Sequence, residues 1–180
     1  MVDFGICDSP VIANMPDLQL ECDAFTLTLQ DIASASMALH PDVPFAWLQS
    51  KSDAVQEAYY DAIGLSMDDE LDVIDDAQFF DGVNTVFADY AKNHDNAVTY
   101  MVDSHMHTYT GLDVVYRSDA TGAEGGGDGI SMLDWISQFP LAKNQTVVSV
   151  CHGDVVSEED RPEHDTGYCA EEVESSYTQK

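Results

Sequence analysis

Two short apolar runs and several helical spacings make up the pattern of hydrophobic positions along the chain. The runs Val43 to Leu48 (VPFAWL) and Ala97 to Val102 (AVTYMV) each stand between polar ends, which is typical of strands buried on both faces of a parallel sheet. Val2 to Cys7 predicts a further short strand near the start, and Thr146 to Cys151 predicts a final edge strand.

Between these runs, apolar residues recur every three or four positions, which is the period of an amphipathic helix. Strands that alternate with helices in this way predict the α/β class, with a parallel sheet flanked by helices. A loop around Pro16 and an acidic loop over 66–76 complete the predicted order. The predicted helices run from Leu29 to a stop before Pro41, from about 53 to a stop at Gly64, over 77–92, and over 131–139.

The charge of the chain is strongly negative. Its 180 residues include 34 Asp and Glu against 6 Lys and Arg, which gives a formal net charge of −28. Such a field repels phosphate backbones, so we expect no nucleic-acid partner and no binding to anionic membrane surfaces. No apolar run approaches the roughly 18 residues that span a bilayer. Similar acidity occurs in proteins adapted to high salt, so the charge alone does not assign a function.

The composition changes after residue 153, where nine of the 27 remaining residues are acidic. We therefore expect one folded region over 1–153 and an acidic, disordered tail over 154–180. A disulfide between Cys151 and Cys169 is the main way in which this tail could be held. The four cysteines form no CxxC pair, and two disulfides are possible in an exported protein. Residues 1–20 lack the basic start and long apolar stretch of a secretory signal peptide.

Candidate catalytic residues follow the two buried-strand runs. Asp53 comes after the first run, and Gln56 three residues later completes the pattern of a helix-capping box, which needs no further role. His107 comes after the second run. Because the carboxyl ends of parallel strands meet at one edge of a sheet, the two side chains are expected there together. An Asp followed by a His in this order matches the last two members of the Ser…Asp…His triad in α/β-hydrolases.

His105 and His107 also offer a metal-binding interpretation. The segment VTYMVDSHMH resembles the H-x-H motif that follows the first barrel strand of amidohydrolases. That barrel needs further ligands on strands spread over about 200 more residues, whereas only His152 and His164 follow here. We therefore expect no metal. No cofactor is expected either, because the glycine-rich loop 122–129 contains two acids, lacks a lysine and fits no nucleotide-binding motif.

Four segments resemble parts of a known family. PFAWLQSKSDAVQEAYYDAIG resembles the F-A-x-x-x-S-x-x-D-x-V-Q segment of pectin acetylesterase-like serine hydrolases, the group that also contains the Notum-type carboxylesterases. HTYTGLDVVYRSDATG and DGISMLDWISQF resemble the later segment of that family, in which a catalytic His-Thr precedes a variable loop and a short G-x-x-x-x-D-W helix. LTLQDIASASMALHPDV fits the preceding helix, so the similarity covers about residues 20–140.

The resemblance implies hydrolysis of a carboxylic ester, such as an acetyl group on a polysaccharide or a small acyl ester, without a cofactor. It implies that Asp53 and His107 are the triad aspartate and histidine, that Asp134-Trp135 is structural, and that the protein is secreted. The nucleophile elbow G-x-S-x-G is absent from these 180 residues. The chain therefore resembles the C-terminal half of an α/β-hydrolase-like domain, with the serine expected upstream of residue 1.

Three explanations fit a half-domain. The chain is a fragment of a longer product, a short paralogue that serves as a non-catalytic binding or decoy domain, or one part of an enzyme whose serine lies on a separate chain. We favour the fragment, because half a parallel sheet would expose an apolar edge beside Val2 to Cys7. In each case we expect the isolated chain to be inactive as an esterase.

Overall fold

The computed structural model describes residues 5–68, 73–109, 130–141, 146–153, 169–170, 173 and 176–178. The chain divides into two compact units, Met1–Pro41 and Asp42–Lys180. Among the described residues, no helix has the length and hydropathy needed to cross a membrane.

The first unit contains α1 (Pro10–Ala13), α2 (Pro16–Asp23) and α3 (Leu29–Leu39). The predicted third helix is confirmed, and a capping box of Thr28 and Asp31 begins it. The first two helices were missed, although each begins with a proline, whose fixed φ suits the first helical position.

The strand expected over Val2 to Cys7 is not formed in its described part. Residues 5–9 turn back on themselves, with Asp8 N–H donating to the carbonyl of Gly5 (3.2 Å), and residues 1–4 lie outside the described residues. Gly5 has a φ of +68°, which a glycine adopts without the strain that a side chain would cause. The Cys7–Cys22 disulfide then ties this turn to α2.

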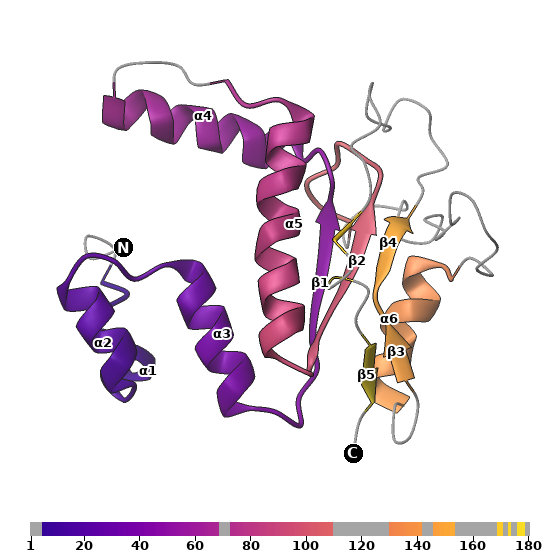
Figure 1. Cartoon of the computed structure of the whole chain (residues 1–180), viewed down its shortest axis with the longest axis horizontal. Helices are drawn as coiled ribbons and strands as arrows, with labels where there is room; N and C mark the ends of the chain where they lie inside the picture. The colour runs from indigo at the N-terminus through magenta and orange to yellow at the C-terminus, as the bar shows by residue number, and fades with distance from the viewer. Residues whose placement is uncertain are drawn as a thin grey trace. The chain divides into compact units, whose positions relative to one another are not determined.

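The second unit is built on a parallel sheet of three strands in the order β1-β2-β4, which confirms the α/β class (Figure 1). The strand predicted over Ala97 to Val102 has the expected bounds. The segment predicted as one edge strand forms two strands, of which β4 joins the parallel sheet and β3 pairs antiparallel with β5. The strands are β1 (Phe45–Ser50), β2 (Ala97–Val102), β3 (Thr146–Val148), β4 (Val150–Gly153) and β5 (Ser176–Thr178).

Helices pack against both faces of this sheet, as the contacts of successive positions in β1 and β2 show. Trp47 faces α5 (Asp76–Asn93) and stacks on Tyr90, with ring centroids 5.5 Å apart. The next positions, Leu48 and its partner Tyr100, face the opposite side, where Tyr100 meets Trp135 of α6 (Met132–Leu141). Since every residue of β2 is buried, the continuous apolar run is explained by cover on both faces.

The remaining helix, α4 (Ala54–Asp68), follows β1 directly. Gly64 was expected to end it, but the helix continues to Asp68 and takes in the start of the predicted acidic loop. The described part of the loop then ends at Asp75, which caps α5 by accepting from the backbone N–H of Gln78 (2.8 Å).

The acidic segment 154–180 differs from the predicted disordered tail at its described positions. Cys169 is bonded to Cys151, so the anticipated disulfide is present. Val173 and Tyr177 are buried, and β5 pairs Val147 with Tyr177. Apolar side chains at these positions therefore bring a segment of acidic composition back to the core, whereas residues 154–168 lie outside the described part of the chain.

Candidate functional site

The candidate site lies at the carboxyl edge of the parallel sheet, where the arrowheads of β1, β2 and β4 point in Figure 1. Backbone hydrogen bonds continue past the strand ends, so that the loop after β1 stays beside the loop after β2. Lys51 N–H donates to Val102 O (2.9 Å), Ser52 N–H to Ser104 O (3.2 Å), and Ala54 N–H to His105 O (3.3 Å). This extended register brings residues 51–54 next to residues 102–107.

Asp53 and His107 meet at this edge. The Nδ1 atom of His107 lies 3.1 Å from Oδ1 and 3.0 Å from Oδ2 of Asp53. Because a carboxylate is only an acceptor, Nδ1 carries the proton and the neutral imidazole has its lone pair on Nε2. The Asp53 side chain is 1% exposed, whereas that of His107 is 42% exposed. The pair thus has a buried anion behind an imidazole that faces solvent.

Asp53 is also the cap of α4. Its Oδ1 accepts hydrogen bonds from the backbone N–H groups of Val55 (3.1 Å) and Gln56 (2.9 Å), which would otherwise lack a partner at the start of the helix. The helix start therefore fixes the carboxylate in place, and the interpretation of Asp53 as a cap is compatible with its contact to His107.

Ser50 and Tyr109 support the loop that carries His107. The hydroxyl of Ser50 donates to the carbonyl of Met106, one residue before His107, and it also bonds the Tyr109 hydroxyl. Since a serine has one hydroxyl proton, Tyr109 is the donor in the second bond. Burial raises the pKa of Tyr109 to about 12, and hydrogen bonds to Ser50 and Ser104 act in the opposite direction.

His105 points to a different partner. Its Nδ1 lies 3.1 Å from the carbonyl oxygen of Ser52, so this nitrogen also carries a proton. Among the described residues, no group of three or more His, Cys, Asp or Glu side chains is placed to hold a metal ion. The geometry therefore gives no support to the H-x-H interpretation of His105 and His107.

Glu57 adds a second carboxyl group to the environment of the pair. Burial raises its pKa, as do the charges of Asp76, Asp53 and Asp61, while His105 opposes the rise. It lies on α4 one turn after Asp53, and its backbone N–H donates to the Asp53 carbonyl (2.9 Å). Sequence reasoning missed it, because a glutamate in the first turn of a helix is ordinary there.

The other expected residues are placed as follows. Asp134 and Trp135 lie in the first turn of α6, where Trp135 is buried and donates from Nε1 to the carbonyl of Val148 (2.8 Å). His164 and the glycine-rich loop 122–129 lie outside the described residues. Sequence reasoning also missed Ser50 and Tyr109. The signal that could have indicated Ser50 is its place just after the apolar run Val43 to Leu48, at the carboxyl end of a predicted strand.

Together these features define an α/β protein with a carboxylate–imidazole pair at the carboxyl edge of its parallel sheet. Comparison of the chain with protein-family models, curated proteins and solved structures gives no match.

Proposed function

We propose that this chain supplies the acid–base half of a serine hydrolase that acts on carboxylic esters. The observation that carries the proposal is the contact between His107 Nδ1 and the buried carboxylate of Asp53. An imidazole held in this way presents Nε2 as a base, while the carboxylate stabilises the imidazolium that forms. The family resemblance described above supplies the reaction class.

In the proposed reaction, His107 takes the proton of a serine hydroxyl as its oxygen attacks the ester carbonyl. The same imidazole then returns the proton to the leaving alcohol, and a water molecule repeats the cycle on the acyl-enzyme. Asp53 keeps the proton of neutral His107 on Nδ1 throughout. Backbone N–H groups near the serine would hold the oxyanion of each tetrahedral intermediate.

The order of strands supports a serine supplied by a further strand. Within the described residues, β1 is paired on one side by β2 and lies at the end of the sheet order. An open strand edge accepts a further strand. A serine-bearing strand at this edge would bring its carboxyl end beside the residues that follow β1, which include Asp53.

The charge of the chain narrows the proposed substrate. A net charge of −28 repels a polyanionic polysaccharide at low ionic strength. Acetyl esters on a neutral polysaccharide, or small acyl esters, are therefore the favoured substrates. Hydrolysis of an acetylated polyanion should rise with added salt, whereas hydrolysis of a neutral ester should not.

The test measures release of p-nitrophenol from p-nitrophenyl acetate by two polypeptides, the 180-residue chain and a longer one that joins it to a serine-bearing segment. The chain alone is expected to match its His107→Ala variant. In the longer polypeptide, His107→Ala should lower kcat on the order of 10⁴-fold or more, because triad members act as a unit. His105→Ala is the matched control and should change kcat only a few-fold.

Two results would contradict the proposal. One is ordinary turnover by the 180-residue chain without any added segment. The other is a longer polypeptide in which His107→Ala and His105→Ala have the same kcat, and this result would favour a non-catalytic binding domain.

A further inference from the structure

A second group of charged and titratable side chains lies at the same edge of the sheet. Lys51 is the first residue after β1, Asp103 is the first after β2, and His152 belongs to β4. The Lys51 ammonium lies 2.8 Å from Asp103 Oδ1 and 2.9 Å from His152 Nδ1, and the second Asp103 oxygen lies 3.6 Å from the same His152 atom. The ammonium therefore links the ends of three parallel strands.

The Lys51 side chain is fully buried, although lysine is rarely found there without compensation. On the side of α5, its ammonium lies over the ring of Phe80, 5.1 Å from the centroid. An ammonium only donates, so His152 Nδ1 is the acceptor and the proton of the neutral ring is on Nε2. Burial acts to raise the pKa of Asp103, whereas the adjacent Lys51 ammonium lowers it through its charge and its hydrogen bond, and the net direction of the pKa is downward.

This cluster is close in sequence to the proposed catalytic pair. Lys51 stands two residues before Asp53, and Asp103 stands four residues before His107. The side chain of His107 is 42% exposed, so little packing holds it, and its position depends on the anchoring of residues 102–107. Asp103 is such an anchor, because its carboxylate meets Lys51 and its backbone N–H donates to Gly153 O on β4 (2.8 Å).

We propose that Lys51 is a positioning residue, whose buried ammonium fixes the start of the 102–107 loop on Asp103 and so holds His107 against Asp53. The inference rests on the proposed function only for the chemical purpose of the pair. It makes a separate statement about the molecule, namely that the hydrogen bond between His107 and Asp53 depends on a cation that is held by Asp103 and His152.

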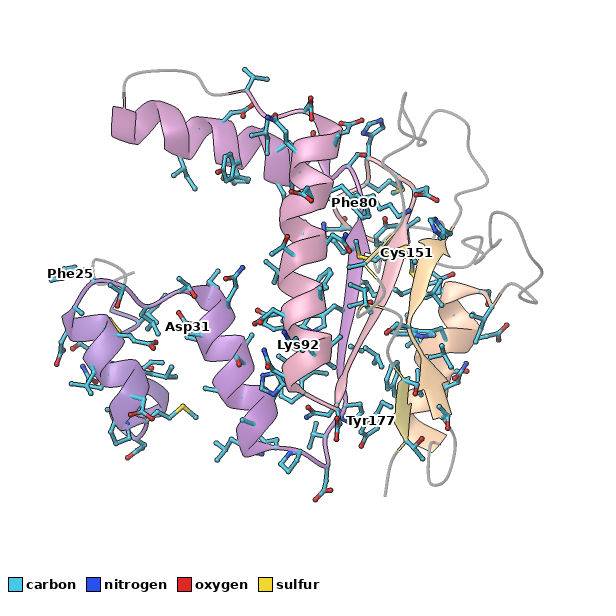
Figure 2. All side chains as sticks on the ribbon, in the orientation of Figure 1. Phe25, Asp31, Phe80, Lys92, Cys151 and Tyr177 are labelled. Carbon is cyan, nitrogen blue, oxygen red and sulfur yellow. A yellow bond between two sulfur atoms is a disulfide. The ribbon has the colours of Figure 1, made fainter. Side chains whose placement is uncertain are left out.

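The test follows the His107 Nδ1 proton by NMR in the 180-residue chain, since a hydrogen bond to a carboxylate slows exchange of this proton with water. Lys51→Met keeps an unbranched side chain, one heavy atom shorter, and removes the charge. We expect the His107 Nδ1–H resonance to be lost, or its exchange to rise at least tenfold. Lys92→Met is the matched control, because Lys92 is exposed and lies at the opposite end of α5 from Phe80 (Figure 2).

A purely structural role for Lys51 is distinguished by a second control. Val98→Ala removes two methyl groups from a fully buried position on β2 and lowers stability without touching the cluster. It should leave the His107 resonance in place. If Lys51→Met loses the spectral dispersion of a folded protein, Asp103→Glu decides the question, because it keeps the charge and displaces the carboxylate. That variant is expected to raise the exchange rate several-fold.

The failures of the two proposals are distinguishable. Suppose that the His107 Nδ1–H is protected in the wild type. If its exchange is the same in folded Lys51→Met, or in Asp103→Glu when Lys51→Met does not fold, the positioning role is overturned. The proposed function would still stand. A wild type without a protected His107 Nδ1–H would overturn the pair itself and both proposals with it.

Discussion

At Asp53, one buried carboxylate accepts hydrogen bonds from two directions. The backbone N–H groups of Val55 and Gln56 reach it from α4, and Nδ1 of His107 reaches it from the loop after β2. The sequence pattern indicated a helix cap and a triad residue as alternatives. A carboxylate has about four lone-pair sites, so both roles fit on one side chain. The contact itself could be expected from strand order, but its support by Ser50 and Tyr109 could not, because that depends on how the loop folds back.

Asp53→Asn should separate these two roles. The amide oxygen of asparagine accepts the same cap bonds, so the free energy of unfolding is expected to fall by less than about 1 kcal/mol. Asp53→Ala removes the cap as well and should cost about 1–2 kcal/mol. Urea denaturation of the two variants measures the difference. Equal losses would show that the cap contributes nothing at this position.

Tyr109 should make stability fall at alkaline pH. Its pKa is raised to about 12 by burial, so the folded state keeps a proton that the unfolded chain loses near pH 10. The resulting stability is fully present below about pH 10 and is lost as the pH rises through about 12. Denaturation of the wild type and of Tyr109→Phe between these limits measures the effect. The phenylalanine variant should show the smaller decline, and parallel declines would contradict the assignment.

At the scale of elements, burial on both faces decided which strands could be predicted. The run that forms β2 is apolar throughout and has the expected bounds, since its neighbours and both helical layers cover it. The final strand was predicted as one segment because its sequence is continuous. The ladder is interrupted where the Ser149 hydroxyl, rather than a carbonyl, accepts from Thr99 N–H (3.1 Å), so β3 and β4 belong to different sheets. α1 and α2 are too short to show a clear helical period.

Gly153 permits the close approach of β4 to β2, because it has no side chain. A Cβ atom there would lie 2.6 Å from Tyr100 Cε1 and 2.9 Å from the carbonyl oxygen of Met101. Gly153→Ala is therefore expected to lower the free energy of unfolding by about 1–3 kcal/mol, as overpacking does. Gly82→Ala is the control, because nothing lies near its Cβ position in α5 and helix propensity should make it stabilising by about 0.5–1 kcal/mol. A neutral Gly153→Ala would contradict the close packing of the two strands.

At the scale of the whole molecule, two compact units, each with an apolar core and a disulfide, share one acidic chain. The first unit has a small core of Ile12, Leu18, Cys22 and Leu27, and a core of this size usually needs a staple such as Cys7–Cys22. The division at Pro41 could not be read from the sequence, because no change of composition marks it. The net charge could be read directly from the sequence, but where the charged side chains lie on each unit depends on the fold.

Salt should stabilise the chain through its net charge of −28. Raising sodium chloride from about 0.1 M to about 1 M shortens the Debye length from about 10 Å to about 3 Å and screens the repulsion among surface carboxylates. We expect Tm, followed by circular dichroism, to rise across this range. A Tm that is unchanged or lower would show that the acidic groups are already compensated within the fold.

The most direct test of the central claim is the tautomer of His107. Long-range ¹H–¹⁵N NMR correlations of the imidazole rings, recorded where the ring is neutral, report which nitrogen carries the proton. We predict a single tautomer with the proton on Nδ1 and the lone pair on Nε2, and a shift toward the other tautomer in Asp53→Asn. A wild-type ring that is protonated on Nε2, or that is unaffected by Asp53→Asn, would contradict the catalytic pair.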